Sequence, residues 1–284
     1  MEVSWHIIFL CCTIIEFVLL ESEAEDFFNI PYTKDDKKFP MNVNSTNSVD
    51  HFNLTQIIIT IILDQKVEIK KTNELVKATL AEPIKDSRVE GGVFKNDRYL
   101  LKEIIFFWTD DTNESAATIV DGENYPLQPV LIFMNDKYDS FEKALDKEDG
   151  LAMLNFLVGI CREENKKFES NEKALKKLQS QTVAESNLNT VTKWFVGEGL
   201  GPNTTYYAYP GPYIDKSANK RYYCATVVTF PNAPQQCLSS RQFKDTFGSF
   251  TNNDGMTLTN EEPASEQTKR IVKSKGVKLN SKFS

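Results

Sequence analysis

Histidine is nearly absent from this sequence of 284 residues, which contains only His6 and His51. Two imidazoles cannot build a zinc site of three histidines, and general acid–base chemistry would fall to carboxylates. No pair stands out among the many acidic residues. The glycine-rich phosphate loop, the dinucleotide-binding fingerprint and the Gly-x-Ser-x-Gly elbow are also missing. The commonest catalytic patterns are therefore excluded.

Long apolar stretches are scarce as well. Ile7–Leu20 is apolar at all but two positions, yet it is too short to cross a bilayer comfortably. Ser22–Ala24 then offers a small-x-small cleavage site, so we interpret residues 1–24 as a signal peptide. An uncleaved anchor is the alternative, because the first six residues lack Lys and Arg. We expect a secreted, extracellular protein without a membrane span after cleavage.

The charge balance gives little indication of a partner. Loss of residues 1–24, which carry four Glu and no basic residue, changes the net charge from −7 to −3. A nearly neutral body gives no reason to bind nucleic acid. Residues 25–272 are expected to form one domain. Residues 273–284 are expected to be a basic C-terminal tail. The wider basic segment Gln267–Ser284 is expected to be solvated, or alternatively to be a strip that docks a polyanion such as a sulfated glycan.

Cysteine is too scarce for a disulfide-rich scaffold. Cys161, Cys224 and Cys237 remain after signal cleavage, which allows one bridge and one free thiol. We expect the bridge to join Cys224 and Cys237, which are close in sequence and flank prolines where a strand should end. Their spacing does not favour a metal site. The glycosylation sequons are at Asn44, Asn53, Asn113 and Asn203.

Strand-like segments outnumber helical ones. Runs rich in β-branched and aromatic residues predict strands, and they are 56–63, 67–69, 75–80, 99–108, 127–134, 151–160 and 222–230. Short helices are expected at 140–146, 171–179 and 238–247, and turns at 91–92, 121–122 and 210–212. This pattern predicts a mostly β (α+β) fold with a large, mainly antiparallel twisted sheet and short peripheral helices.

Several motifs resemble the α-carbonic anhydrases, in the correct order over residues 37–272. They are Phe39–Val43, Gly91–Val93, Tyr99–Leu101 with Trp108, Val120–Gly122, Asn135–Tyr138 with Phe141 and Ala144, Asp149–Leu154, Tyr209–Gly211, and Asn260, Pro263, Arg270 and Val272. Each piece is weak alone, but their order makes the signal specific. The resemblance implies the fold of that family.

The same resemblance implies that the catalytic residues are lost. In that family, His-x-His on one strand and a third His on its neighbour hold Zn²⁺, which activates a water molecule. Here Ile105, Phe107 and Val130 stand at those three positions. The other departures lie where the family has its proton shuttle and the groups that orient ligand and hydroxide; they are Glu74, Ala117, Gln128 and Ile214. We expect the apolar side chains to fill the volume of the zinc site.

These positions predict an inactive, secreted carbonic anhydrase-related protein without a cofactor. It would act as an extracellular binding or structural module, with an extracellular protein or an anionic glycan as the partner. A residual or repurposed hydratase or esterase activity is the alternative. A bulk secreted component without a specific partner is a third interpretation.

Overall fold

A computed structural model describes most of the chain from Met41 onward. The described residues are 41–51, 53–71, 76–80, 87–196, 200–215, 220–231, 237–248 and 271–282. The expected signal peptide and Glu74 lie outside them. Residues 37–284 form one compact unit, and all described residues belong to it.

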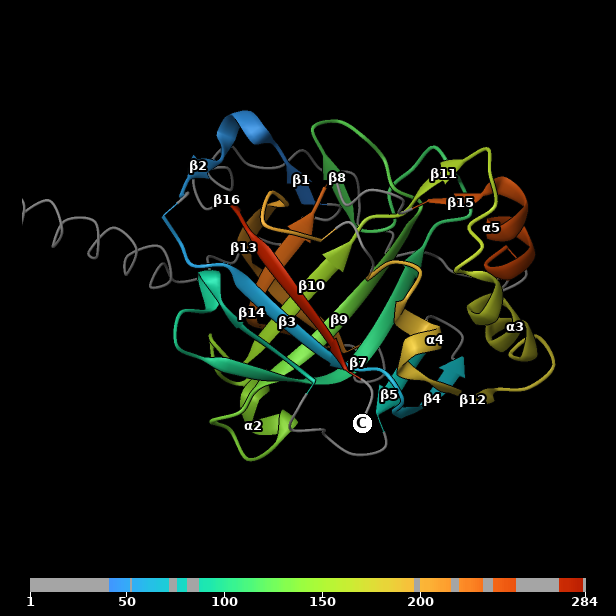
Figure 1. Cartoon of the computed structure of the whole chain (residues 1–284), viewed down its shortest axis with the longest axis horizontal. Coiled ribbons are helices and arrows are strands. Elements are labelled where there is room, and N and C mark those ends of the chain that lie inside the picture. Colours follow the sequence, from blue (N-terminus) through green and yellow to red (C-terminus); the bar gives the residue numbers. More distant parts are fainter. Residues whose placement is uncertain are drawn as a thin grey trace, which may run out of the picture. The chain divides into compact units, whose positions relative to one another are not determined.

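A 13-stranded sheet dominates the described part of the chain (Figure 1). Its main path runs β12-β4-β5-β7-β9-β10-β14-β13-β16-β2, while β3 joins β6 to β17 and β6 also pairs with β7. The strands of the first half are β2 (Val49–Asp50), β3 (Ile57–Ile62), β4 (Lys66–Lys71), β5 (Val76–Leu80), β6 (Arg88–Gly91), β7 (Arg98–Trp108) and β9 (Leu127–Asn135). The others are β10 (Leu151–Phe156), β12 (Val183–Asn187), β13 (Thr205–Asp215), β14 (Lys220–Phe230), β16 (Val272–Lys275) and β17 (Val277–Lys282).

Most neighbouring strands in this sheet are antiparallel, which confirms the predicted fold class. The parallel pairs are β10 with β14, β16 with β2, and β17 with β3. Two small parallel pairs lie apart from the sheet; they are β1 (Met41–Val43) with β8 (Thr118–Val120), and β11 (Gly159–Cys161) with β15 (Cys237–Ser239). Parallel neighbours need long connections, which explains why these pairings join distant parts of the chain.

Alternation along β7 gives the sheet two different faces. Ile105 and Phe107 point to one face, whereas Phe106 and Trp108 point to the other, as the two-residue period of a strand requires. On that second face Phe106 packs against Trp194, Phe195 and Phe247, with ring centroids 6.2–6.5 Å apart. An aromatic core therefore lies on the side opposite to Ile105.

The helices of the described chain are short. They are α2 (Phe141–Leu145), α3 (Glu169–Lys177), α4 (Leu188–Thr192) and α5 (Ser240–Thr246), with 3-10 turns η1 (Ser45–Asn47) and η2 (Gly92–Phe94). Helices α3, α4 and α5 lie together beside the β11–β15 pair and β12, on the right in Figure 1. A capping box of Ser239 and Gln242 starts α5. The three predicted helices are confirmed, with ends shifted by one or two residues.

The expected turn at 210–212 is wrong. Strand β13 continues through Pro210 and Gly211 and pairs with β14 from Tyr207 to Asp215, with a register shift between Gly211 and Tyr213. The opposite edge of β13 pairs with β16 only up to Ala208 within the described residues. Proline is tolerated at such an edge, and the shift absorbs the local irregularity.

The expectation of a solvated tail at 273–284 is also wrong for residues up to Lys282. Strand β16 pairs with β13, and β17 pairs in parallel with β3 at six positions. Val277 is almost fully buried, as is Ser274, whose hydroxyl donates to the His51 carbonyl at 2.6 Å. Buried and more exposed positions alternate along β16 with the period of a strand, so Lys275 occupies an outer position, and Lys278 on β17 is exposed as well.

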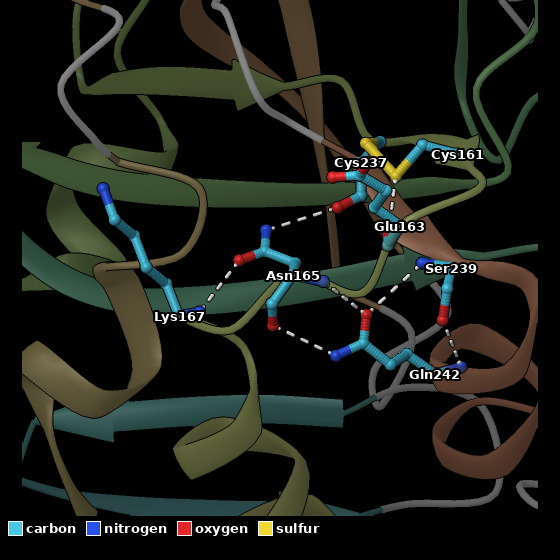
Figure 2. Close-up of a disulfide and its surroundings, with 7 residues drawn as sticks. All are labelled: Cys161, Glu163, Asn165, Lys167, Cys237, Ser239 and Gln242. Atoms are coloured by element: carbon cyan, nitrogen blue, oxygen red, sulfur yellow. Dashed lines mark hydrogen bonds between the residues drawn. A yellow bond between two sulfur atoms is a disulfide. The ribbon is translucent and has the colours of Figure 1, made fainter.

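The predicted Cys224–Cys237 disulfide is wrong as well. The bridge joins Cys161 to Cys237, with Cα atoms 5.7 Å apart (Figure 2). Cys224 is a buried free thiol. Cys161 and Cys237 end and begin the paired strands β11 and β15, whereas Cys224 lies within β14. Burial raises the pKa of the Cys224 thiol to about 12. Cys161 and Cys237 are 76 residues apart in the sequence, and the pairing of β11 with β15 brings them within bonding distance.

Polar contacts support this bridge from α5 (Figure 2). The Gln242 amide oxygen accepts from Asn165 N at 2.8 Å, and its amide nitrogen donates to Asn165 O at 3.0 Å. The Asn165 side chain in turn donates to Cys237 O at 3.2 Å. These bonds hold the loop after β11 against the start of α5.

Candidate functional site

A small cavity lies on the face of the sheet to which Ile105 and Phe107 point. It is lined by residues from five neighbouring strands and from the segment around β8, namely Ile105, Phe107, Ala117, Thr118, Gln128, Val130, Ile132, Met153, Asn155, Tyr209, Gly211, Pro212, Tyr213 and Val227. The space open to the centres of water-sized molecules is about 40 Å³. One water needs about 10–15 Å³ by this measure, so a few waters would fill it.

Strand register places the three predicted zinc-ligand positions together at this cavity. Ile105 on β7 stands directly opposite Val130 on β9, and Phe107 stands opposite Gln128. Val130 in turn faces Asn155 on β10. Ile105 and Val130 are almost fully buried, while Phe107 is half-buried. The expected filling of this volume by apolar side chains is incomplete, because the cavity remains.

The other predicted positions divide into two groups. Ala117 and Gln128 line the cavity and are buried. Ile214 lies on β13 opposite Arg221, directly after the lining residue Tyr213, and its side chain is outside the description. Glu74 is outside the described residues altogether. The structure thus brings together every predicted site position whose side chain it describes.

Two amide oxygens in the cavity wall have no hydrogen-bond partner within the described part of the chain. They are Gln128 Oε1 and Asn155 Oδ1, on side chains 2% and 5% exposed. The Asn155 amide nitrogen makes a long contact of 3.4 Å with Thr229 Oγ1. A buried acceptor without a donor costs free energy, so each of these oxygens is a local cost to the stability of the fold.

The two tyrosine hydroxyls of the wall are already bonded. Tyr209 and Thr229 share a hydrogen bond of 2.8 Å between their hydroxyls. Burial raises the pKa of Tyr209, which keeps its hydroxyl neutral. The Tyr213 hydroxyl donates to Glu103 Oε1 at 2.9 Å, and Lys77 Nζ lies 2.5 Å from Glu103 Oε2. The buried Glu103 carboxylate is therefore paired, and it is not among the lining residues.

Tyr213 also shows how strongly the sheet is curved. It belongs to β13, and its partner Glu103 belongs to β7, yet three strands separate these two in the sheet order. The contact is possible only if the sheet bends around the cavity. Tyr213 therefore links two walls across the cavity.

The donor set does not fit zinc. Zinc in proteins is held by imidazole nitrogen, thiolate sulfur or carboxylate oxygen. None of the described residues that line the cavity is His, Cys, Asp or Glu. No group of three such residues with suitable placement for a metal occurs among the described residues.

The predicted glycosylation sites lie at the surface of the described chain. Asn53, Asn113 and Asn203 are exposed, whereas Asn44 is half-buried at the start of η1. The Asn44 side-chain oxygen accepts from the Thr46 amide at 2.9 Å and from its hydroxyl at 2.7 Å. Glycan attachment itself stays a prediction.

Sequence reasoning missed Asn155, Met153, Tyr209 and Tyr213 as cavity residues. Asn155 carried a signal, because it is a lone strongly polar residue within the apolar run that formed β10. Its approach to Gln128 depends on the register of β9 with β10, which cannot be read from composition.

Comparison with known proteins identifies the family. A family model of the eukaryotic-type carbonic anhydrases matches residues 25–219, which include every lining residue of the cavity except Val227. The chain therefore belongs to the eukaryotic-type carbonic anhydrase family, as the sequence motifs predicted. It is similar to carbonic anhydrase 15 of Mus musculus, with 27% identity over 127 residues, 43% of this chain and 38% of that protein. The match thus spans well under half of this relative.

None of the helices in the described part of the chain has the length and apolar character that crossing a bilayer requires.

Proposed function

We propose that this chain is a secreted, extracellular carbonic anhydrase-related protein that binds no zinc, and that it acts as a binding module rather than as a hydratase. The observation that carries this proposal is the identity of Ile105, Phe107 and Val130, which line the cavity where the family resemblance expects three imidazoles. A chain with only two histidines cannot supply that set.

The chemistry of hydration supports the proposal. Hydroxide must be generated near neutral pH, and in a zinc site the metal does this by lowering the pKa of bound water to about 7. Without a metal, a general base would have to take this role. Glu103 contacts the cavity wall through Tyr213, and its carboxylate is already paired with Lys77 and with the Tyr213 hydroxyl.

The replacements also stabilise a metal-free fold. Full burial of an aliphatic side chain contributes about 1.5–3 kcal/mol, and Ile105 and Val130 are buried to that extent. Polar ligands around an empty site would instead carry a desolvation cost. The domain therefore needs no zinc to complete its core.

An extracellular protein or an anionic glycan is the proposed partner class. Lys275 and Lys278 are exposed on β16 and β17, so basic residues of the C-terminal segment remain at the surface as part of a rigid strand. Binding to a polyanion would weaken with salt, since the Debye length falls to about 8 Å at 0.15 M. Salt-dependent retention on immobilised heparin would favour the glycan over a protein partner.

Metal analysis and carbon dioxide hydration test the proposed loss of zinc. Protein purified without chelators should contain far less than one zinc per chain and should not accelerate hydration above the buffer rate. Zinc at one per chain together with sulfonamide-sensitive hydration would overturn the proposal.

A variant with the three histidines restored provides the matched comparison. Ile105→His, Phe107→His and Val130→His together should raise zinc affinity, since register places the first and third positions opposite each other. Hydration should stay well below that of an active family member, because Gln128, Ala117 and Ile214 remain. Full activity of the triple variant would show that these other departures are unimportant.

A further inference from the structure

Strand register gives the cavity a continuous apolar floor. Ile105 on β7 stands opposite Val130 on β9. Two residues further along the same face of β9, Ile132 stands opposite Met153 on β10, and Met153 in turn stands opposite Val227 on β14. All five residues line the cavity. Side chains directly opposite each other in a sheet are close neighbours, so these five form one hydrocarbon surface across four strands.

The hydroxyl groups around this floor are bonded to other protein groups. The Tyr213 hydroxyl donates to Glu103, which is not a lining residue. The Tyr209 hydroxyl shares a hydrogen bond with the Thr229 hydroxyl and has a second side-chain contact with Thr118. Both tyrosines line the cavity, and both have used their polar atom elsewhere. A molecule in the cavity therefore meets mainly the rings of these two residues.

The two amide oxygens of the wall are not exposed to the space either. Gln128 Oε1 and Asn155 Oδ1 have almost no accessible surface, so a molecule in the cavity does not reach them. None of the described lining residues carries an ionisable carboxylate, ammonium, guanidinium or imidazole group. The surface that faces the cavity is therefore mostly apolar and has no formal charge.

We propose that this cavity binds a small, uncharged, apolar molecule of the hydrocarbon type, in the volume where the family resemblance places the metal. Ile105, Phe107 and Val130 make this possible, because they put hydrocarbon where three imidazoles would hold zinc. The inference deepens the proposed function and rests on it in that this volume must be free of zinc. It assigns a ligand class to the binding module.

Water is a poor occupant of such a space. A buried water usually makes two to four hydrogen bonds, and apolar cavities larger than one water stay dry and take up apolar solutes. Here the tyrosine hydroxyls are bonded and the two amide oxygens are covered. An apolar molecule gains contacts with the floor and gives up no hydrogen bond on entry.

The size of the cavity limits the ligand to a few heavy atoms. The free space of about 40 Å³ is a small multiple of the 10–15 Å³ that one water requires. Affinity should be in the millimolar range, because so small a molecule makes few contacts. A charged group is excluded, since a buried ion without a counter-charge is strongly disfavoured.

Three probes with three heavy atoms each test this ligand class on the full-length mature protein. Propane is apolar, ethanol carries one hydroxyl, and ethylammonium carries a charge. Chemical-shift titration of isotope-labelled protein, with propane supplied under pressure, should show saturable shifts at the methyl groups of Ile105, Val130 and Met153. Propane should bind at least about tenfold more tightly than ethanol, whose hydroxyl would lose its bonds to water, and ethylammonium should not bind measurably.

A matched pair of variants locates the binding. Ala117 lines the cavity, whereas Ala116, its neighbour in sequence, is buried to a similar extent and is not a lining residue. Ala117→Val adds two methyl groups to the free space and should weaken propane binding by about tenfold or more. Ala116→Val adds the same groups away from the wall and should leave propane affinity unchanged within about twofold. A thermal melt of each variant establishes that it is folded.

The contrary outcomes are distinct from one another. Ethanol or ethylammonium binding as tightly as propane, or no saturable shift with propane at any attainable pressure, would overturn the proposed ligand class. These results come from the wild-type protein and do not depend on whether a variant folds. Equal loss of propane binding in folded Ala117→Val and Ala116→Val would place the site elsewhere and overturn it as well. Zinc at one per chain in the same preparation would instead overturn the proposed function, and the metal analysis separates the two failures.

Discussion

At the scale of single residues, adjacent aromatic side chains on β7 have different roles. Phe106 is 1% exposed within the aromatic core, whereas Phe107 is half-buried in the cavity wall. Phe106→Ala should lower the free energy of unfolding by about 3–5 kcal/mol, because it leaves a cavity among Trp194, Phe195 and Phe247. Phe107→Ala should cost clearly less, because this ring is partly solvated. Urea unfolding of the two variants checks the order.

The reversed order would contradict this assignment of the two faces. Phe107→Ala should also enlarge the cavity, which Phe106→Ala should leave unchanged. Comparison of the two variants therefore distinguishes a residue that stabilises the fold from a neighbouring residue that shapes the cavity.

The cysteines provide a second prediction at this scale. The mature protein should contain one thiol per chain, at Cys224, and this thiol should react with a thiol reagent only after unfolding. Its burial, together with a pKa raised to about 12, keeps the reactive thiolate scarce at neutral pH. Peptide mapping without reduction should recover Cys161 linked to Cys237.

Replacement of the bridge tests its contribution to stability. Cys161→Ala with Cys237→Ala should lower the free energy of unfolding by about 2–5 kcal/mol, since the bridge constrains a long loop of the unfolded chain. Cys224→Ala is the control and should cost less. A peptide that links Cys224 to Cys237 would refute the pairing given by the structure.

At the scale of elements, the C-terminal strand is a structural part of the sheet. Truncation after Gly276 removes β17, which pairs with β3 along Ile57–Ile62 and buries Val277. Loss of six paired positions exposes apolar side chains and the backbone of β3, so the truncated protein should be strongly destabilised or insoluble. Truncation after Lys282 keeps all six positions of β17 that pair with β3 and should have a much smaller effect. Thermal unfolding distinguishes the two, and equal stability would show that β17 is dispensable.

Sequence patterns predicted those strands that are rich in the residue types typical of strands. The β-branched and aromatic runs that became β3, β7, β9, β10 and β14 were correctly expected as strands. Strand β13 was missed because Pro210 and Gly211 favour turns in isolation, and only its place at a partly unpaired edge tolerates them. Strands β16 and β17 were missed because their lysines masked the alternation of buried and exposed positions.

The site shows the same division between local and long-range information. Ordered motifs located Ile105, Phe107, Val130, Ala117 and Gln128, and register then brought them to one cavity. The unpaired oxygen of Asn155 and the Cys161–Cys237 bridge depend on pairing between distant strands. No local pattern reports such pairing, so these features required the three-dimensional structure.

At the scale of the whole molecule, the surface position of the sequons leads to a prediction about secretion. Asn53 precedes β3, Asn113 lies between β7 and β8, and Asn203 precedes β13, so all three are on exposed connections. The Asn113 amide nitrogen donates to Asp111 Oδ1 at 3.0 Å, an exposed bond that a glycan could replace at little cost. Asn44 is less accessible, because it is half-buried and its side chain bonds Thr46.

We therefore expect protein from a eukaryotic secretory host to lack residues 1–24 and to lose mass on treatment with an N-glycosidase. Asn53→Gln, Asn113→Gln and Asn203→Gln together should remove most of that shift, and Asn44→Gln alone should remove little. The sequon at Asn53 should be removed by substituting Asn53 and not Thr55. The Thr55 hydroxyl accepts a hydrogen bond of 2.9 Å from the Gly92 amide and helps to order the start of η2. A cytosolic, unglycosylated product that retains residues 1–24 would refute secretion. A shift that persists in the triple variant and disappears with Asn44→Gln would show instead that local bonding does not limit glycan attachment.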